Sequence, residues 1–340
     1  MKKIIPVFLS LFSIQVLADS KEQKILADLP KIKSAAALVI DLNTGEVLFE
    51  READVVRPIA SISKVMGAIV IYKYCNLKPE DLHTMSVENR DAAKGGDKTR
   101  LTTGWAYSHH DLMKAALMRS DNRALPALGQ ACGMDTVKFG ERMTEEAKLM
   151  GLTNTSFKEP NGLNKENVST PREIMVFLKE AIKIEEIKDI MGTKESTIVG
   201  HRDNRTRSVE IRNTDRLLSK DLATILGGKT GYTDIARYCL AIAAETAEKR
   251  RLGMVFLAAE GKHTRFADFT RVINWLFTGK AFAGETKQTT QPSTPAADQD
   301  KSLPVAPNTI LNPTETPIGT SALKDGGASA KPKDLFEYYW

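Results

Sequence analysis

The sequence has few cysteines, few aromatic residues and no helical metal-binding motif. Three cysteines in 340 residues are too few to hold a small disulfide-dense domain together. Aromatic residues make up 6% of the chain, which disfavours a stacking platform for sugars or bases. None of the five histidines belongs to a His-Glu-x-x-His motif, and the adjacent His109 and His110 would point to different sides of a helix. A metal hydrolase is therefore disfavoured, and no metal ligand is predicted.

The chain also lacks a strong excess of charge. Its net charge is +5, and its lysines and arginines are spread along the sequence. Proteins that bind nucleic acid usually concentrate basic residues in one stripe, so no nucleic-acid partner is expected. The length allows one large domain or two small ones with a well-buried core.

Residues 1–18 have the pattern of a secretory signal peptide. Lys2 and Lys3 precede an apolar stretch, and Val16 and Ala18 stand at minus three and minus one of a cleavage site. The stretch is shorter than the about 20 residues that span a bilayer, which disfavours an uncleaved anchor. The mature protein is therefore expected to be exported, with no integral membrane span.

Cys75, Cys132 and Cys239 are odd in number, so at least one of them is unpaired or bonds elsewhere. An exported protein can form disulfides. Cys239, however, lies in the alternating run RYCLAIAA, which is typical of a core strand. We predict a buried free thiol for all three cysteines.

The apolar pattern predicts strands at both ends of a mostly helical middle segment, which spans about residues 76–200. A hairpin is expected at 35–50 around Asn43-Thr44-Gly45, and a buried helix at 61–75 with Ser61 at its start. The strand pattern returns from about 205. Further helices are predicted at 110–119, 122–132, 135–150, 171–186 and 264–278. This order predicts an α+β fold, an antiparallel sheet flanked by helices with a helical subdomain.

Residues 281–340 differ in composition from the rest of the chain. They hold half of the 14 prolines, among Thr, Ala, Gln, Ser and Gly. This composition is typical of a disordered low-complexity tail. The folded domain is therefore expected to span residues 19–280.

Three short motifs of catalytic type occur in the chain. They are Ser-x-x-Lys at 61–64, Ser-Asp-Asn at 120–122 and Lys-Thr-Gly at 229–231. The spacing puts Ser61 and Lys64 on one face of a helix, at an N-terminus whose free N–H groups favour an oxyanion. Lys64 can act as a base only if its pKa is lowered, either by burial or by a nearby cation such as Lys229.

The other two motifs each have a structural alternative. At 120–122, Ser120 would relay a proton to a leaving nitrogen and Asn122 would hold the substrate backbone, or these residues would simply cap a helix. At 229–231, a glycine in a strand indicates close approach of another backbone, or the motif is a turn. A second Ser-x-x-Lys at 321–324 lies in the tail, where it has no scaffold. The order of the three motifs on these predicted elements favours a catalytic site.

The motifs and the blocks around them resemble the serine D-alanyl-D-alanine peptidases, the low-molecular-mass penicillin-binding proteins. The similarity covers about residues 34–278 and includes PIASISKVMGAIV, ALMRSDNRA, AKLMGLTNTSFKEPNGL and GGKTGYTDIARYCL. The block GKHTRFADFTRVINWL is most similar to the penicillin-binding protein 7 type, a D,D-endopeptidase. The resemblance implies a β-lactamase/transpeptidase-like fold, a periplasmic location and no cofactor.

The resemblance also implies a role for each site residue. Ser61 would be the acylated nucleophile, Lys64 its general base and Ser120 a further catalytic residue, with the N–H groups of Ser61 and Tyr232 as the oxyanion hole. The substrate-binding residues would be Asn122, Lys229, Thr230, Gly231, Tyr232 and Arg265. The implied partners are peptide crosslinks of peptidoglycan and β-lactam antibiotics.

Three alternatives share these residues. A D,D-carboxypeptidase would differ in what its leaving-group side accepts. A class A β-lactamase would also need a glutamate that activates the deacylating water, for which Glu159 and Glu166 are the candidates. A non-catalytic module that binds wall peptides or β-lactams would use the same pocket without chemistry.

Overall fold

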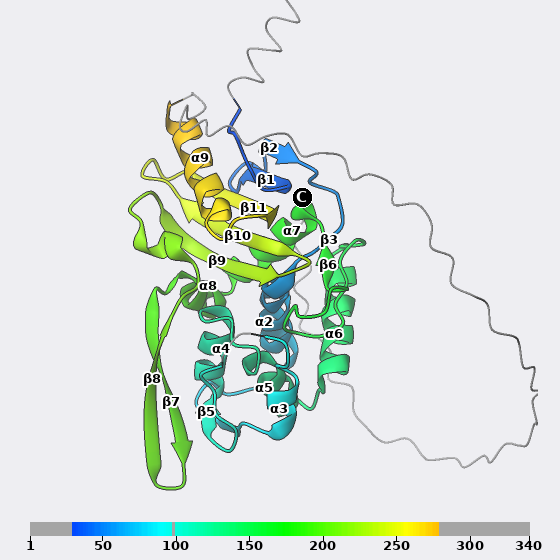
Figure 1. Cartoon of the computed structure of the whole chain (residues 1–340), viewed down its shortest axis with the longest axis vertical. Helices are drawn as coiled ribbons and strands as arrows, with labels where there is room; N and C mark the ends of the chain where they lie inside the picture. Colours follow the sequence, from blue (N-terminus) through cyan, green and yellow to red (C-terminus); the bar gives the residue numbers. More distant parts are fainter. Residues whose placement is uncertain (1–28, 97–98, 279–340) are drawn as a thin grey trace, which may run out of the picture. The chain divides into compact units, whose positions relative to one another are not determined.

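A five-stranded antiparallel sheet brings the first hairpin of the chain beside its last three strands (Figure 1). The computed structural model describes residues 29–96 and 99–278. The strand order is β2-β1-β11-β10-β9, which leaves β9 at one edge of the sheet as described. The strands are β1 (Ala36–Asp41), β2 (Val47–Arg51), β9 (Thr224–Thr233), β10 (Arg237–Glu245) and β11 (Arg251–Ala259).

Helices cover both faces of this sheet. Successive side chains of a strand point to opposite faces. In β1, Leu38 therefore joins the core that contains helices α2 (Ser63–Tyr74) and α7 (Pro171–Lys183), whereas Val39 joins the core of α9 (Thr264–Thr278). Burial on both faces explains why β1 is apolar from Ala36 to Ile40 rather than alternating.

The remaining helices lie on the α2 and α7 side of the sheet. Thr170 caps α7, since its side chain accepts a hydrogen bond from the Glu173 backbone, and Pro171 takes the first helical position. The helices are α3 (Val87–Asp91), α4 (His109–Leu117), α5 (Ala124–Ala131), α6 (Thr136–Leu149) and α8 (Glu185–Gly192), and the 3₁₀ turns are η1 (Ala60–Ile62) and η2 (Arg216–Ser219).

The α+β expectation is confirmed, and several expected elements are found. The hairpin at 35–50 turns at Gly45, whose φ of 78° requires the left-handed conformation that glycine adopts readily. The closing helix spans Thr264–Thr278. The helix expected at 171–186 is two helices instead, because Ile184 has an extended ψ of 105° between α7 and α8.

The segment expected to be mostly helical, about 76–200, also contains strands. A second sheet has the order β4-β5-β7-β8, and its β7 begins at Glu195, before the expected return of strands at about 205. Only Ile198 and Gly200 are buried in β7, so the apolar alternation is weak. The strands are β4 (Leu82–Thr84), β5 (Ala106–Ser108), β7 (Glu195–Arg202) and β8 (Arg205–Arg212), with a separate pair β3 (Arg57–Pro58) and β6 (Val168–Ser169).

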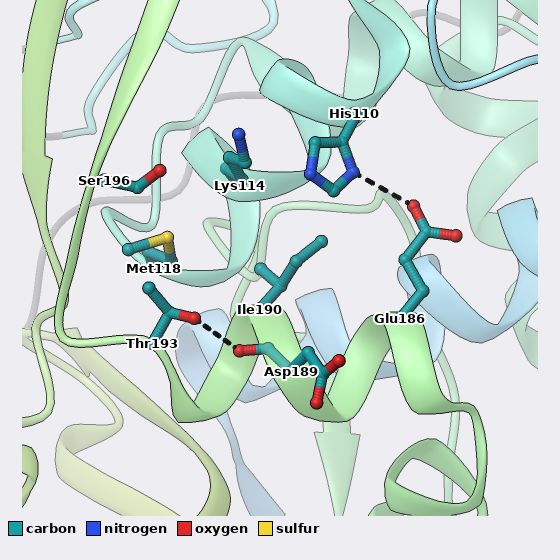
Figure 2. Close-up of a pocket in the computed structure, with 8 residues that line it drawn as sticks. All are labelled: His110, Lys114, Met118, Glu186, Asp189, Ile190, Thr193 and Ser196. Carbon is teal, nitrogen blue, oxygen red and sulfur yellow. Dashed lines mark hydrogen bonds and ion pairs between the residues drawn. The ribbon is translucent and has the colours of Figure 1, made fainter.

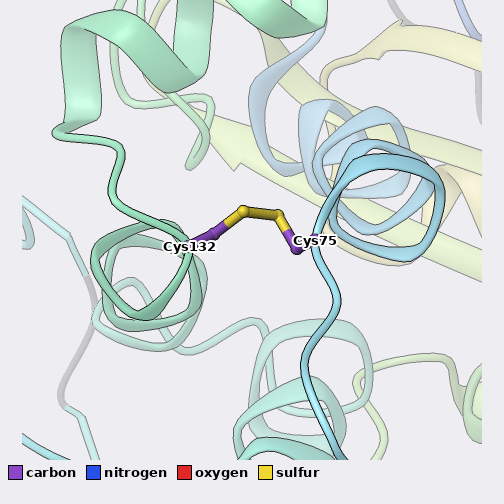
Figure 3. Close-up of a disulfide and its surroundings, with 2 residues drawn as sticks. All are labelled: Cys75 and Cys132. Carbon is purple, nitrogen blue, oxygen red and sulfur yellow. A yellow bond between two sulfur atoms is a disulfide. The ribbon is translucent and has the colours of Figure 1, made fainter. Parts of the chain in front are cut away.

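The prediction of three free thiols is wrong for two of them. Cys75 and Cys132 form a disulfide with a Cα–Cα distance of 5.5 Å (Figure 3). They directly follow α2 and α5, and only the packing of these helices brings them together across 57 residues. Cys239 is a buried free thiol as predicted, and burial raises its pKa to about 11.

Two expectations fall outside the described residues, namely the signal peptide at 1–18 and the low-complexity tail at 281–340. Within the described residues, no helix has both the length and the apolar character needed to cross a membrane.

Removal of the disulfide is expected to destabilise the domain. The double change Cys75→Ser and Cys132→Ser should lower the free energy of unfolding by about 2–4 kcal/mol, because the crosslink restricts the unfolded chain. Denaturant unfolding with and without a reductant measures this. The double variant should be insensitive to the reductant. A wild type that unfolds identically with and without reductant would contradict the disulfide.

Candidate active site

Ser61 lies in the tight turn η1, directly before α2. Its neighbour Ala60 has a positive φ of 49°, which turns the chain sharply into the helix. A Cβ at Gly231 of β9 would lie 3.0 Å from the Ser61 backbone nitrogen, and one at Gly162 would overlap the Ala60 carbonyl group. Two glycines therefore let two backbones approach the serine from different sides.

Lys64 is fully buried and its amine touches three oxygens. Nζ lies 3.1 Å from Ser61 Oγ, 2.8 Å from Asn122 Oδ1 and 2.7 Å from the Asn161 carbonyl oxygen. Burial lowers the pKa of Lys64 to about 8, although the charges of Glu159 and Asp121 oppose this shift. Burial, the largest cause of this shift, therefore gives a lysine that exchanges protons near neutral pH.

The Ser-Asp-Asn motif links α4 to α5, as expected. Ser120 has a positive φ of 63° and is partly buried. Asp121 fixes this turn, since its carboxylate accepts hydrogen bonds from the Thr99 hydroxyl and the Arg123 backbone N–H. The turn presents Asn122 to Lys64. The structure thus joins Asn122 directly to the Ser61–Lys64 pair, whereas no hydrogen bond between Ser120 and that pair is found among the described residues.

The Lys-Thr-Gly motif lies on the edge strand β9 and not in a turn. Lys229 is 1% exposed, and its Nζ donates to the Thr230 carbonyl at 2.9 Å. Thr230 Oγ1 lies 2.7 Å from Thr214 Oγ1, and the Thr214 backbone N–H donates to the carbonyl of Met118. Thr214 therefore connects β9 to the end of α4, where the Ser-Asp-Asn turn begins.

Tyr232 lies near the C-terminal end of β9, and Arg265 of α9 contacts the same strand. Arg265 is 7% exposed, and its Nη1 donates to the Gly231 carbonyl at 2.8 Å. Its guanidinium also lies near the rings of Tyr238 and Phe266. Tyr232 is half exposed and stacks on Tyr238 with ring centroids 4.2 Å apart. The structure thus brings Arg265 to the Lys-Thr-Gly strand.

The buried charges of the site are mostly positive. Burial, helped by the charges of Lys64 and Arg265, lowers the pKa of Lys229 well below its usual value. The opposing group is Asp215, which is 2% exposed. Burial raises the pKa of Asp215 to about 6, and one of its carboxylate oxygens, Oδ2, is buried without a hydrogen-bond partner. The site is therefore short of negative charge and suited to an anionic group.

Sequence reasoning missed the turn at residues 159–164, which we call the Glu159 turn. Its two carboxylate oxygens accept four backbone N–H bonds, from Asn161 at 2.6 Å, from Gly162 and Leu163 at 2.8 Å, and from Asn164 at 3.2 Å. The turn delivers the Asn161 carbonyl to Lys64. The only sequence signal was the block KEPNGL, whose spacing reveals no contact.

The Glu159 turn bears on the β-lactamase alternative. Both carboxylate oxygens of Glu159 are engaged by backbone N–H groups, so the side chain is bound as a structural ligand rather than aimed at a water. Glu166 is exposed and lies 3.9 Å from Lys158. Among the described residues, neither candidate glutamate makes a hydrogen bond to Ser61 or Lys64.

A separate half-open hollow of about 420 Å³ lies between α4, α8 and β7 (Figure 2). His110 and Glu186 line it and form an ion pair or hydrogen bond at 3.3 Å, and Met118 and Ser196 also line it. None of the predicted site residues lines this hollow. Among the described residues, no group of three His, Cys, Asp or Glu side chains is arranged to hold a metal ion.

Known proteins match the chain over most of its length. The model of the peptidase S11 family, described as D-alanyl-D-alanine carboxypeptidase, matches residues 22–261. The D-alanyl-D-alanine endopeptidases of Escherichia coli and Pseudomonas aeruginosa are each 34% identical to this chain. Those matches cover 75% and 82% of this chain, and 80% and 89% of the relatives. The Streptomyces K15 DD-transpeptidase structure has a TM-score of 0.68 and 27% identity, covering 73% of this chain and 98% of that one.

The chain is thus a serine-type D-Ala-D-Ala peptidase of the penicillin-binding class, a hydrolase. It belongs to the peptidase S11 family. This confirms the resemblance inferred from the motifs, and the fold matches that of the solved DD-transpeptidase. The family implies peptidoglycan peptides as substrates and β-lactams as ligands.

We predict that Glu159→Gln damages both stability and acylation. The neutral amide offers one acceptor oxygen and sets an NH₂ group against backbone N–H donors. We expect a loss of about 2–4 kcal/mol in the free energy of unfolding. Acylation by benzylpenicillin should slow by about tenfold, because the Asn161 carbonyl no longer holds Lys64 in place.

Glu166→Gln is the matched control. Its exposed ion pair is worth less than about 1 kcal/mol, so stability and acylation should stay within error of the wild type. Denaturant unfolding and stopped-flow acylation measure both variants. An intact acylation rate in Glu159→Gln would refute the positioning role of the turn.

Proposed function

We propose that this protein is a periplasmic D,D-endopeptidase that hydrolyses crosslinks of peptidoglycan through an acyl-enzyme on Ser61. The observation that carries the proposal is the contact between Ser61 Oγ and the buried amine of Lys64, at 3.1 Å. A lysine with a pKa of about 8 is a competent base near neutral pH, as an activated serine requires.

In the proposed acylation, neutral Lys64 takes the hydroxyl proton while Ser61 Oγ attacks the carbonyl of a D-Ala residue. The backbone N–H groups of Ser61 and Tyr232 donate to the oxyanion, since Gly231 brings β9 next to the serine nitrogen. The C–N bond then breaks, and Ser120 relays the proton held by Lys64 to the leaving amine. In deacylation, Lys64 takes a proton from the water that attacks the ester carbonyl, and passes it to Ser61 Oγ as the ester C–O bond breaks.

The positive end of the site would bind a carboxylate. Lys229 and Thr230 on β9 supply an ammonium and a hydroxyl, and Arg265 adds a guanidinium beside Gly231. A bound carboxylate would raise the pKa of Lys229, because it supplies the negative charge that the pocket lacks. Asn122, which holds Lys64, would also contact the substrate backbone. The carboxylate of a β-lactam would occupy the same place.

The choice of endopeptidase rests on similarity. In a crosslink, D-Ala is joined to the side-chain amine of a diamino acid on a neighbouring strand. The two relatives that are 34% identical are named D-alanyl-D-alanine endopeptidases, whereas a Bacillus subtilis relative that is 30% identical is named a carboxypeptidase. A carboxypeptidase is the second candidate, supported by the description of the family model. The signal-like residues 1–18 support export to the periplasm.

We predict that Ser61→Ala abolishes the covalent adduct with benzylpenicillin and lowers hydrolysis by about 1,000-fold or more. Intact-protein mass spectrometry should show one whole antibiotic on the wild type and none on the variant. Ser321→Ala is the control, because it alters the second Ser-x-x-Lys and should label normally. A fully labelled Ser61→Ala would disprove the assignment of the nucleophile.

Products separate the two candidate activities. Purified crosslinked muropeptide dimers should yield monomers at a higher kcat/KM than pentapeptides yield free D-Ala. The reverse order would replace the endopeptidase with a carboxypeptidase.

We also predict that acylation depends on pH through Lys64. The active form is the neutral amine, so the rate should rise about tenfold per pH unit below the pKa and level off above about 8. Stopped-flow acylation between about pH 5.5 and 9.5 measures this. Lys64→Arg should show no acylation at any pH, since a guanidinium does not deprotonate. A flat profile in the wild type would rule out Lys64 as the base.

A further inference from the structure

Three arginines share one face of the hairpin formed by β7 and β8. Gly200 pairs with Arg207 and Arg202 pairs with Arg205 across the two strands. Residues opposite each other in an antiparallel pair, and residues two apart along a strand, lie on the same face. Arg202, Arg205 and Arg207 therefore form one patch, which we call the arginine face.

The arginine face lies at the tip of a hairpin that projects from the helices and the five-stranded sheet (Figure 1). All three arginines are exposed. The one acidic residue in the turn, Asp203, lies 3.5 Å from Arg205 and 4.0 Å from Arg202. Arg207 has no ion-pair partner in the described part of the chain. One carboxylate is thus shared among three guanidinium groups.

This arrangement has a cost within the chain. Like charges directly opposite each other in a sheet are destabilising, and Arg202 and Arg205 are such a pair. Charged residues on an edge strand such as β8 also prevent pairing with other chains, but alternating signs would serve that purpose equally well. Charges of one sign on one face therefore point to an anionic partner.

We propose that the arginine face binds carboxylates of the peptidoglycan polymer and holds the enzyme on the wall while Ser61 cleaves single crosslinks. This inference rests on the proposed function. Stem peptides carry free carboxylates at many positions, and a guanidinium binds a carboxylate through two parallel hydrogen bonds. Residues 201–207 (HRDNRTR) contain no large apolar side chain to insert into a bilayer, which favours the polymer over a lipid surface.

The test is co-sedimentation with purified sacculi in a Ser61→Ala background, so that binding is measured without digestion. Against this parent, we compare the triple change Arg202→Gln, Arg205→Gln and Arg207→Gln. The parent should bind, and its binding should weaken with salt. The triple change should reduce affinity by about tenfold at low salt, as expected for the loss of three exposed charge contacts. Samples without sacculi exclude sedimentation by aggregation.

The matched control removes three exposed lysines outside the β7–β8 hairpin, with Lys78→Gln, Lys138→Gln and Lys148→Gln. This control should bind sacculi like the parent, because the proposal assigns binding to a location and not to total charge. With Ser61 intact, the arginine variant should cleave soluble crosslinked dimers at the wild-type rate and digest sacculi about tenfold more slowly.

Equal binding of the parent and the arginine variant would overturn the proposal. Arginine-dependent binding to vesicles with anionic lipids, without binding to sacculi, would overturn it in favour of a membrane surface. Failure of the wild type to cleave soluble dimers would contradict the proposed endopeptidase instead, and co-sedimentation would still decide the role of the arginine face.

Discussion

The site depends on a lysine amine buried without a carboxylate in contact. Lys64 is held instead by the oxygens of Ser61, Asn122 and Asn161, which belong to three separate segments of the chain. The lowering of its pKa from 10.5 to about 8 corresponds to about 3 kcal/mol disfavouring the charged form. Neutral oxygens orient the amine without restoring its charge, which is the combination that a base beside a serine requires.

The fold provides that environment by close backbone packing. Gly231 on β9 and Gly162 in the Glu159 turn approach η1 where a larger residue would collide with it. The position of β9 is fixed by its pairing with β10. The position of α2 is fixed by the core on one face of the sheet, in which its apolar side chains are buried. The Cys75–Cys132 disulfide joins the C-terminal ends of α2 and α5. Lys64 lies in the first turn of α2, and Asn122 lies just before the first residue of α5.

Local sequence patterns predicted what depends on local structure. The hairpin at 35–50, the α2 region and the closing helix follow from periodicity and turn residues. The motifs lie on the expected elements, except that Ser61 is in the turn η1 directly before the expected helix. The strand β7 was missed because only Ile198 and Gly200 of its eight residues are buried. The Cys75–Cys132 pairing and the Asn161 contact were missed because they arise when distant segments pack together. Neither leaves a pattern in a single sequence.

The electrostatics of the site support the proposal that it binds a carboxylate. Lys229 and Arg265 are both buried, and burial lowers the pKa of each. The negative charge of the buried Asp215 opposes these positive charges. Burial raises the pKa of Asp215 to about 6, so its ionised form is itself disfavoured. The protein therefore leaves its positive charge incompletely compensated. In the proposed function, a ligand carboxylate would complete the balance, and its binding energy would be directed to the part of β9 that lies beside Ser61.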